Sequence, residues 1–258
     1  MIFQESCPAL TNDNPNNTMT TQKILNTGNN KTSKGEKLGW KTYGIHLAPS
    51  KVSGYNVCKW ASKGCAMACL NTAGRGMMDV VQQARIKKTR RFFEDRQGFL
   101  DQLVDEITKA VRSAERGGYK PCFRLNLTSD IPWERVKIDG ENIFQIFTGV
   151  QFYDYTKSTE RMDAYLAGSL PVNYHLTLSR SEDSDDQQLM TVMDYGGNTA
   201  IVFRGMIPET WNGYPVIDAD ENDLRFLDPQ GVVCGLVEKG LAKKDLSGFV
   251  LEPQSCDA

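Results

Sequence analysis

Three features that often classify a chain are missing from this sequence. No run of about eighteen apolar residues occurs, which excludes a transmembrane helix of the usual length. The N-terminus has no basic stretch followed by an apolar one, so we expect no secretory signal and a location in a reducing cytoplasm. The formal net charge is only -2, so any contact with nucleic acid must come from a local cluster of basic residues.

The length and the composition predict one large domain with a polar extension. The chain has 258 residues, enough to bury a full hydrophobic core. Residues 1–36 are rich in Asn, Thr, Lys and Gly and contain few large apolar side chains. Such a segment buries too little surface to offset the entropy lost on ordering, so we expect a mobile polar arm or a lightly docked extension. Residues 37–258 would then form a single metal-binding domain.

Strand-like and helical patterns alternate through the rest of the chain. Apolar runs of strand length occur at residues 42–48, 122–130, 149–157, 172–182, 198–205, 214–220 and 231–240. Helical spacing of apolar residues occurs between most of them, for example at residues 77–94 and 95–116, where Asp95 is expected to cap the second helix. Strands joined by helical crossovers pair in parallel, so the sequence predicts an α/β fold built as a parallel βα barrel or partial barrel.

Three cysteines, Cys58, Cys65 and Cys69, lie together between the first predicted strand and the first long helix. In a reducing compartment such a cluster is more typical of metal ligands than of disulfides. Thiolates bind soft metals, and three of them leave one position of a [4Fe-4S] cluster open. The sequence therefore predicts an iron–sulfur site with one non-cysteine position. Two alternatives remain open: a zinc ion with His46, Cys234 or another group as fourth ligand, or thiols that bind no metal.

Polar side chains stand where the predicted strands end. In parallel βα folds the carboxyl ends of the strands meet at one rim, where ligands bind. We therefore predict that Asp130 and Asp154 serve in proton transfer, and that six further side chains hold a small-molecule ligand. These six are Ser129, Tyr155, Lys157, Ser179, Ser181 and Arg204. An anionic group on the ligand would favour the two cations among them. The alternative is that each residue only caps the helix that follows its strand.

One basic stretch is the candidate for contact with nucleic acid. On a helix, Lys87, Arg90 and Arg91 lie on one face together with Glu94. Such a face can hold phosphate groups. More often, a charged helix face is simply solvated.

A three-cysteine loop directly after the first strand of a parallel βα barrel resembles the arrangement in radical-SAM enzymes. In that superfamily the open iron of a [4Fe-4S] cluster binds the methionine end of S-adenosylmethionine, so the resemblance implies this compound as a further cofactor. Two departures are plain. The cysteine spacing here is C-x6-C-x3-C rather than C-x3-C-x2-C, and no Gly-Gly-Glu type of motif follows the second predicted strand.

Six segments of the chain, in the same order, resemble a family of phage proteins called gene product 88. They are GYNVCKWASKGCAMACLNTAGRG, ARIKKTRRFFEDRQGFL, LNLTSDIPWE, FYDYTK, NYHLTLSRSE and RFLDPQGVVCGLVEKG. The resemblance runs from about Leu38 to Val250. It implies a phage protein expressed in a host cytoplasm, and it implies little about activity.

Two other functions fit the same residues. Phages carry distant relatives of queuine transglycosylases, in which one carboxylate attacks a sugar carbon and another moves a proton. Asp130, Asp154 and Asp218 would suit such a base-modifying enzyme with a structural zinc. The third possibility is a protein that binds a metal or senses redox state without catalysis.

Overall fold

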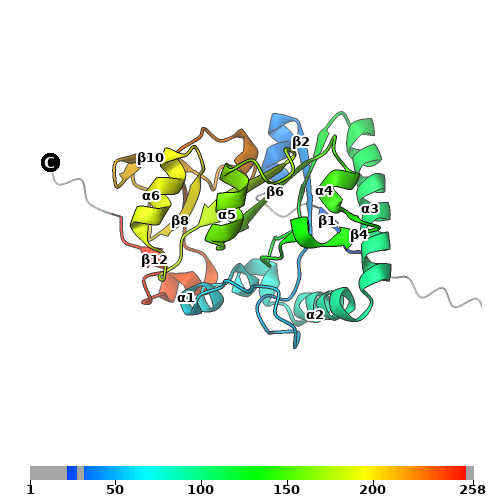
Figure 1. The fold of residues 1–258 in the computed structure, drawn as a ribbon. Helices are drawn as coiled ribbons and strands as arrows, with labels where there is room; N and C mark the ends of the chain where they lie inside the picture. The colour runs from blue at the N-terminus through cyan, green and yellow to red at the C-terminus, as the bar shows by residue number, and fades with distance from the viewer. Residues whose placement is uncertain (1–21, 28–31, 254–258) are drawn as a thin grey trace, which may run out of the picture.

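A computed structural model describes residues 22–27 and 32–253 of the chain (Figure 1). Its centre is one sheet of ten strands, most of which are parallel. The strand order is β1-β2-β3-β6-β7-β8-β11-β10-β9, and β12 pairs with β8 beside this path.

The seven longest strands of this sheet run parallel to one another. They are β2 (Trp40–Gly44), β3 (Lys120–Arg124), β6 (Gln151–Thr156), β7 (Tyr174–Ser179), β8 (Thr199–Phe203), β11 (Val233–Val237) and β10 (Tyr214–Asp218). The short edge strands β1 (Asn26–Thr27) and β9 (Thr210–Trp211) are antiparallel to their neighbours. β12 (Val250–Leu251) is parallel to the end of β8, and β4 (Lys137–Ile138) forms a separate hairpin with β5 (Glu141–Asn142).

The mostly parallel α/β sheet expected from the sequence is confirmed. Each predicted strand segment overlaps one of the seven parallel strands. From β2 to β8, each strand pairs with the next parallel strand along the chain, whereas β11 inserts between β8 and β10. Right-handed crossovers between successive neighbours place the connecting helices on one face of the sheet. The strand pairings of the described residues do not show a closed barrel.

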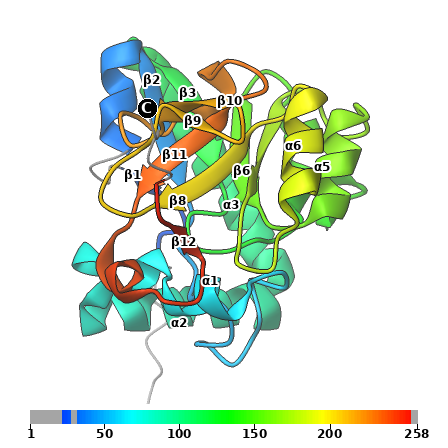
Figure 2. The same ribbon diagram turned by 90° about the vertical axis from the view of Figure 1, so that its left-hand side faces the viewer.

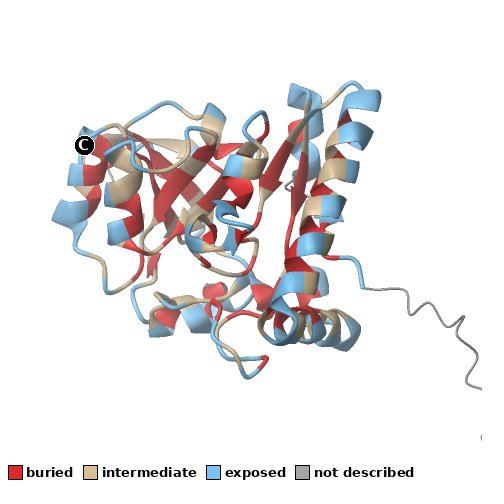
Figure 3. Cartoon of the chain, turned by 45° about the vertical axis from the view of Figure 1, so that its right-hand side comes forward, coloured by how far each residue is buried: buried red, intermediate tan, exposed pale blue. Residues whose placement is uncertain are grey.

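The helices that connect the strands pack on one face and form the main core with it. They are α3 (Arg96–Arg116), α4 (Ile143–Ile146), α5 (Thr159–Leu166) and α6 (Asp186–Asp194). Asp95 caps α3 as expected, because its carboxylate accepts from the backbone N–H of Gly98 at 3.2 Å. The core joins helix residues Phe99, Leu103, Ile107, Phe144, Met162 and Leu189 to strand residues Phe123, Phe152, Leu176 and Ile201. Figure 3 shows this buried layer between the strands and the helices.

The opposite face of the sheet, which we call the inner face, is covered by residues 219–228, including the 3-10 turn η5 (Arg225–Leu227). Leu224 packs there against Cys122 and Tyr153. The carboxylate of Asp223 accepts two hydrogen bonds from Arg124 at 3.1 Å, and one from the Tyr153 hydroxyl at the same distance. This face therefore contains a buried ion pair beside its apolar contacts.

Part of the predicted N-terminal arm is docked on the domain. Ile24 and Leu25 are buried, and their backbone N–H groups donate to the carboxylate of Glu106. A further 3-10 turn, η1 (Thr32–Leu38), leads into β2. Most of the arm, together with Cys7 and Cys256, lies outside the described residues. Within the described part of the chain, no helix combines the length and the apolarity needed to cross a membrane.

Candidate functional site at the carboxyl ends of the strands

The residues after β2 form a layer across the carboxyl ends of the parallel strands, at the bottom of Figures 1 and 2. We call residues 50–94 the cap. It contains α1 (Lys63–Met67), the 3-10 turns η2 (Leu70–Thr72) and η3 (Gly74–Met77), and α2 (Asp79–Glu94). All three clustered cysteines lie in the cap, between β2 and α2.

Two contacts fix the cap to the ends of the strands. The backbone N–H of Asp130, beyond the end of β3, donates to the carbonyl of Val57 at 2.8 Å. Glu182, beyond the end of β7, accepts from the Ser62 hydroxyl at 2.6 Å and from the backbone N–H of Gly64 at 2.5 Å. Because both partners follow the carboxyl ends of strands, the predicted position of the cysteine loop at this rim is confirmed.

The third support of the cap is a C-terminal segment, residues 238–252, which contains η6 (Gly240–Lys244). Ala242 and Val250 of this segment form a small apolar cluster with Ala68 of the cap. Arg204, at the end of β8, holds the segment by donating to the carbonyl of Asp245 at 2.7 Å and to the carboxylate of Glu252 at 2.5 Å. The C-terminal segment therefore packs against the part of the cap that contains the cysteines.

The three thiols of the cap share one environment. Cys58, Cys65 and Cys69 are each half-buried. Burial raises the pKa of all three thiols, and raises that of Cys58 to about 12. Part of the rise at Cys58 comes from the charges of ionised Cys69 and Cys65, and ionised Cys69 also raises the pKa of Cys65. The three sulfurs therefore lie close enough to influence one another's ionisation.

Hydrogen-bond donors and one cation offset part of the rise in the pKa of these thiols. The backbone N–H of Ser50 donates to Cys58 Sγ at 3.3 Å. A backbone hydrogen bond from Asn71 and the charge of Arg85, on α2, both lower the pKa of Cys69. N–H groups directed at cysteine sulfur stabilise the thiolate, which is the form that binds metals. Among the described residues, no group of three or more His, Cys, Asp or Glu side chains is arranged to hold a single metal ion.

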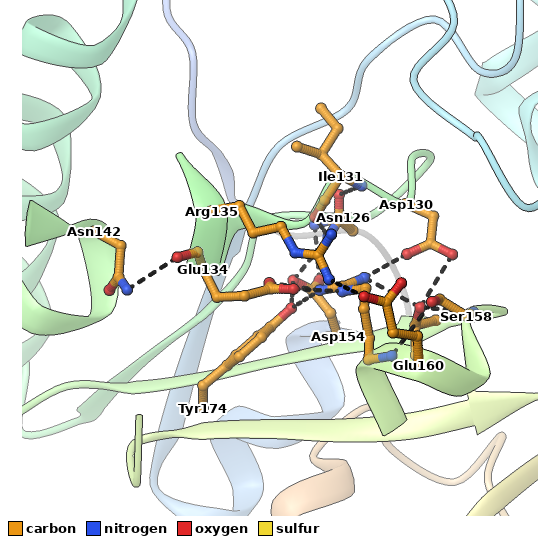
Figure 4. A network of polar contacts seen from close by, with 12 residues as sticks. Asn126, Asp130, Ile131, Glu134, Arg135, Asn142, Asp154, Ser158, Glu160 and Tyr174 are labelled. Atoms are coloured by element: carbon orange, nitrogen blue, oxygen red, sulfur yellow. Dashed lines mark hydrogen bonds and ion pairs between the residues drawn. The ribbon is translucent and has the colours of Figure 1, made fainter. Parts of the chain in front are cut away.

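The two predicted catalytic carboxylates lie in one polar network on the helix face (Figure 4). Asp154 is fully buried and accepts from the backbone N–H and side-chain amide of Asn126 and from the Tyr174 hydroxyl. Burial raises its pKa to about 7, against the opposing effect of these donors and of nearby arginines. Asp130 accepts from the backbone N–H of Lys157 at 2.8 Å. Both carboxylates order the segment between β3 and α4, and their catalytic role stays a prediction.

Arg161 of α5 is the centre of this network. Its guanidinium donates to both oxygens of Glu134, at 2.8 and 2.9 Å, and to Asp130 Oδ1 at 2.6 Å. It also donates to the hydroxyls of Thr156 and Tyr174. The side chain is fully buried, so these contacts replace its hydration completely.

The predicted ligand-binding residues fall into two groups. Most are used within the fold. Lys157 donates to Ser179 Oγ at 3.0 Å and to two backbone carbonyls, Ser181 contacts Ser184, and Ser129 donates to Asn126. Tyr155 differs from them. Its ring lies 4.4 Å from the Arg124 guanidinium on the inner face, and its buried hydroxyl has no hydrogen-bond partner among the described residues.

The basic stretch of α2 is only partly as predicted. Arg91 is half-buried and donates to the carbonyl of Gly98 at 3.0 Å, so it belongs to the packing of α2 against α3. Lys87 and Arg90 are exposed, as a phosphate-binding face requires. Contact with nucleic acid stays a prediction for these two residues.

A family model described as Gene product 88 matches residues 17–253, nearly the whole chain. The chain belongs to the gene product 88 family. The predicted resemblance to this phage family is therefore confirmed, and the family match covers the cap, the strands and the C-terminal segment alike. Curated proteins and solved structures gave no match to the chain. The resemblance to radical-SAM enzymes stays a prediction.

Sequence reasoning missed three residues that shape the site: Asn126, Arg161 and Glu182. Asn126 and Glu182 stand in the family-like segments LNLTSDIPWE and NYHLTLSRSE, which also contain residues that were selected. Their roles depend on partners far along the chain, since Glu182 binds Gly64 and Asn126 binds Asp154. No local pattern carries that information.

Proposed function

We propose that Cys58, Cys65 and Cys69 bind one [4Fe-4S] cluster and leave one iron open to a small ligand. The observation that carries the proposal is the placement of three mutually interacting, half-buried thiols in one loop at the carboxyl rim of a parallel sheet. The rim is where parallel α/β folds bind ligands. A [4Fe-4S] cluster with every iron bound to protein uses four cysteines, so three thiolates leave one iron open.

The surroundings of the sulfurs support thiolate ligands. A buried thiolate needs hydrogen-bond donors or cations, and Ser50, Asn71 and Arg85 supply these to Cys58 and Cys69. Binding must displace thiol protons, because burial holds the pKa of each thiol above its ordinary value.

One zinc ion has no ready set of ligands among the described residues. A single ion needs ligands that converge on one point, and no such group occurs in the part of the chain that the structure describes. A four-iron cluster attaches each thiolate to a different iron, so its ligands are farther apart. Of the two suggested fourth ligands, Cys234 is already used within the fold, since it is buried on β11 and donates to Asp228.

We place the small ligand between the open iron and the inner face of the sheet, which would form a partial barrel around it. The Tyr155 hydroxyl is the best candidate contact, because a buried hydroxyl without a partner gains most from a ligand acceptor. Lys157 and Arg204 would need to release backbone carbonyls before they could bind an anionic group. S-adenosylmethionine is the first ligand to examine, and a reducing host cytoplasm suits such a site.

The test is reconstitution of the full chain with iron and sulfide under anaerobic conditions, followed by iron, sulfide and zinc analysis and electron paramagnetic resonance. We expect about four irons and four sulfides per chain. Cys58→Ala, Cys65→Ala and Cys69→Ala should each lower this loading, whereas the matched controls Cys7→Ala and Cys256→Ala should not. Stoichiometric zinc without acid-labile sulfide in protein made without oxygen would refute the cluster.

Titration of the loaded protein with S-adenosylmethionine tests the open iron separately. A change in the spectrum of the reduced cluster, weakened in Tyr155→Phe, would support a radical-SAM-like site. An unchanged spectrum at saturating concentration would refute this ligand while leaving the cluster itself intact.

A further inference from the structure

The cap carries a charge opposite to that of the rest of the protein. Residues 50–94 contain nine Lys or Arg and two Asp or Glu, which gives a formal charge of +7. The whole chain, with 30 basic and 32 acidic residues, has a net charge of -2, so the remaining residues carry -9. The near-neutral total therefore hides a strongly basic layer at one end of the sheet.

Most of this positive charge faces solvent. Three of the nine cations are buried or half-buried: Arg85 binds Asn71, Lys88 donates to the carbonyl of Ile24, and Arg91 packs on α3. The other six are Lys51, Lys59, Lys63, Arg75, Lys87 and Arg90, and all of them are exposed. η6, which contacts η2, adds the exposed Lys243 and Lys244 to the same layer.

Exposed apolar side chains lie among these cations. Met67, Leu70, Met77 and Met78 of the cap are exposed by 59%, 55%, 65% and 56%. The Trp60 ring is half-buried, with the ammonium of Lys59 5.6 Å from its centroid. Flexible apolar and aromatic side chains beside cations can contact bases while the cations contact phosphates.

We propose that the cap binds the sugar-phosphate backbone of nucleic acid, with Lys59, Lys63 and Arg75 as its main phosphate contacts. These three exposed cations stand close to the cysteines in the sequence. Bound nucleic acid would therefore lie near the cysteine loop. The interaction needs no metal, so it stands apart from the proposed cluster.

The composition of the cap favours nucleic acid over a protein partner. Four of its six exposed cations are lysine, a residue that protein–protein interfaces use sparingly. The charge is spread over the whole cap and is not concentrated in a pocket, as expected for a surface that follows a repeating backbone. An acidic protein or an anionic membrane is the competing partner and is included in the test.

The test measures binding of the full chain, without metal, to fluorescently labelled oligonucleotides of about 20 nucleotides, longer than one binding site. Single-stranded DNA, duplex DNA and single-stranded RNA form three arms, each followed by anisotropy between about 50 and 200 mM salt. We expect binding that weakens steeply with salt, with a log–log slope of about -4 on the duplex. The oligonucleotide that binds most tightly identifies the type of nucleic acid.

The variant Lys59→Gln/Lys63→Gln/Arg75→Gln should bind at least about tenfold more weakly and reduce the salt slope by about 3. The matched control Arg112→Gln/Arg116→Gln/Lys120→Gln removes the same charge at the opposite, amino-terminal end of the sheet. It should change affinity less than about twofold. Circular dichroism verifies that both variants are folded.

Three outcomes would overturn the proposal. The first is no binding to any arm at the lowest salt. The second is equal weakening by the cap variant and the control, which would mean that only total charge matters. The third is equal or tighter binding to polyglutamate or to phosphatidylglycerol vesicles than to all three nucleic acids.

Discussion

The network around Arg161 gives the sharpest test of what holds the site in place. In Arg161→Met the guanidinium is replaced by an apolar chain of similar length, while its anionic partners remain. Glu134 and Asp130 are 8% and 12% exposed, so neither carboxylate can recover its hydration without moving. Removing one partner of a buried ion pair costs about 3–5 kcal/mol. We expect the free energy of unfolding to fall by that amount.

The assay is chemical denaturation followed by tryptophan fluorescence, since Trp133 is fully buried beside the network. The control is Arg135→Met, which removes a neighbouring arginine whose ion pair with Glu160 is 55% and 71% exposed. A pair this exposed contributes less than about 1 kcal/mol. Arg161→Lys should fall between the two variants, because it keeps the charge but loses the paired hydrogen bonds to Glu134.

The pH dependence of Arg161→Met has a definite sign. Burial already raises the pKa of Asp130 and Arg161 lowers it, so the variant raises that pKa further. A carboxyl group with a raised folded pKa keeps its proton where the unfolded chain has lost it, so falling pH stabilises the folded state. The loss of stability should therefore shrink between about pH 7 and pH 5. A loss equal to that of Arg135→Met, or one independent of pH, would refute the reasoning.

Three further predictions concern the cap and the inner face. Gly64→Ala would place its Cβ 2.7 Å from Glu182 Oε2, so iron loading should fall and the melting temperature should drop by several degrees, whereas Gly149→Ala, with open space around it, should change neither. Tyr155→Phe should leave the denaturation midpoint unchanged because its hydroxyl has no described partner, and a loss above about 1 kcal/mol would contradict this. The metal-free protein should lose stability as pH rises above about 9, since unfolded thiols ionise there while Cys58, with its pKa raised to about 12, keeps its proton; Cys58→Ala should weaken that alkaline loss in pH-dependent melts.

Local sequence patterns were sufficient to predict the strands and helices and the parallel pairing of the strands. Each strand segment was recognised by apolar runs of strand length, and Asp95 was recognised as a helix cap, because both depend on neighbours within a few residues. Helices between strands require parallel pairing, so the position of the cysteine loop at the carboxyl rim followed as well. Closure of the sheet did not follow, because it depends on strand tilt and register across the whole sheet.

The amino-acid sequence by itself determined the alternation of strands and helices, the spacing of the three cysteines and the excess of positive charge in the cap. Only the tertiary structure decided how the polar residues are used. Asp154 and Lys157 both stand at the end of a predicted strand. In the structure Asp154 is fully buried and accepts hydrogen bonds, whereas Lys157 donates to neighbouring backbone carbonyls. Arg85 and Lys87 belong to one basic run, yet one is buried beside Cys69 and the other is exposed. The physical reason is that a polar side chain takes its role from its hydrogen-bond partners and its hydration, and both are set by residues distant in the chain.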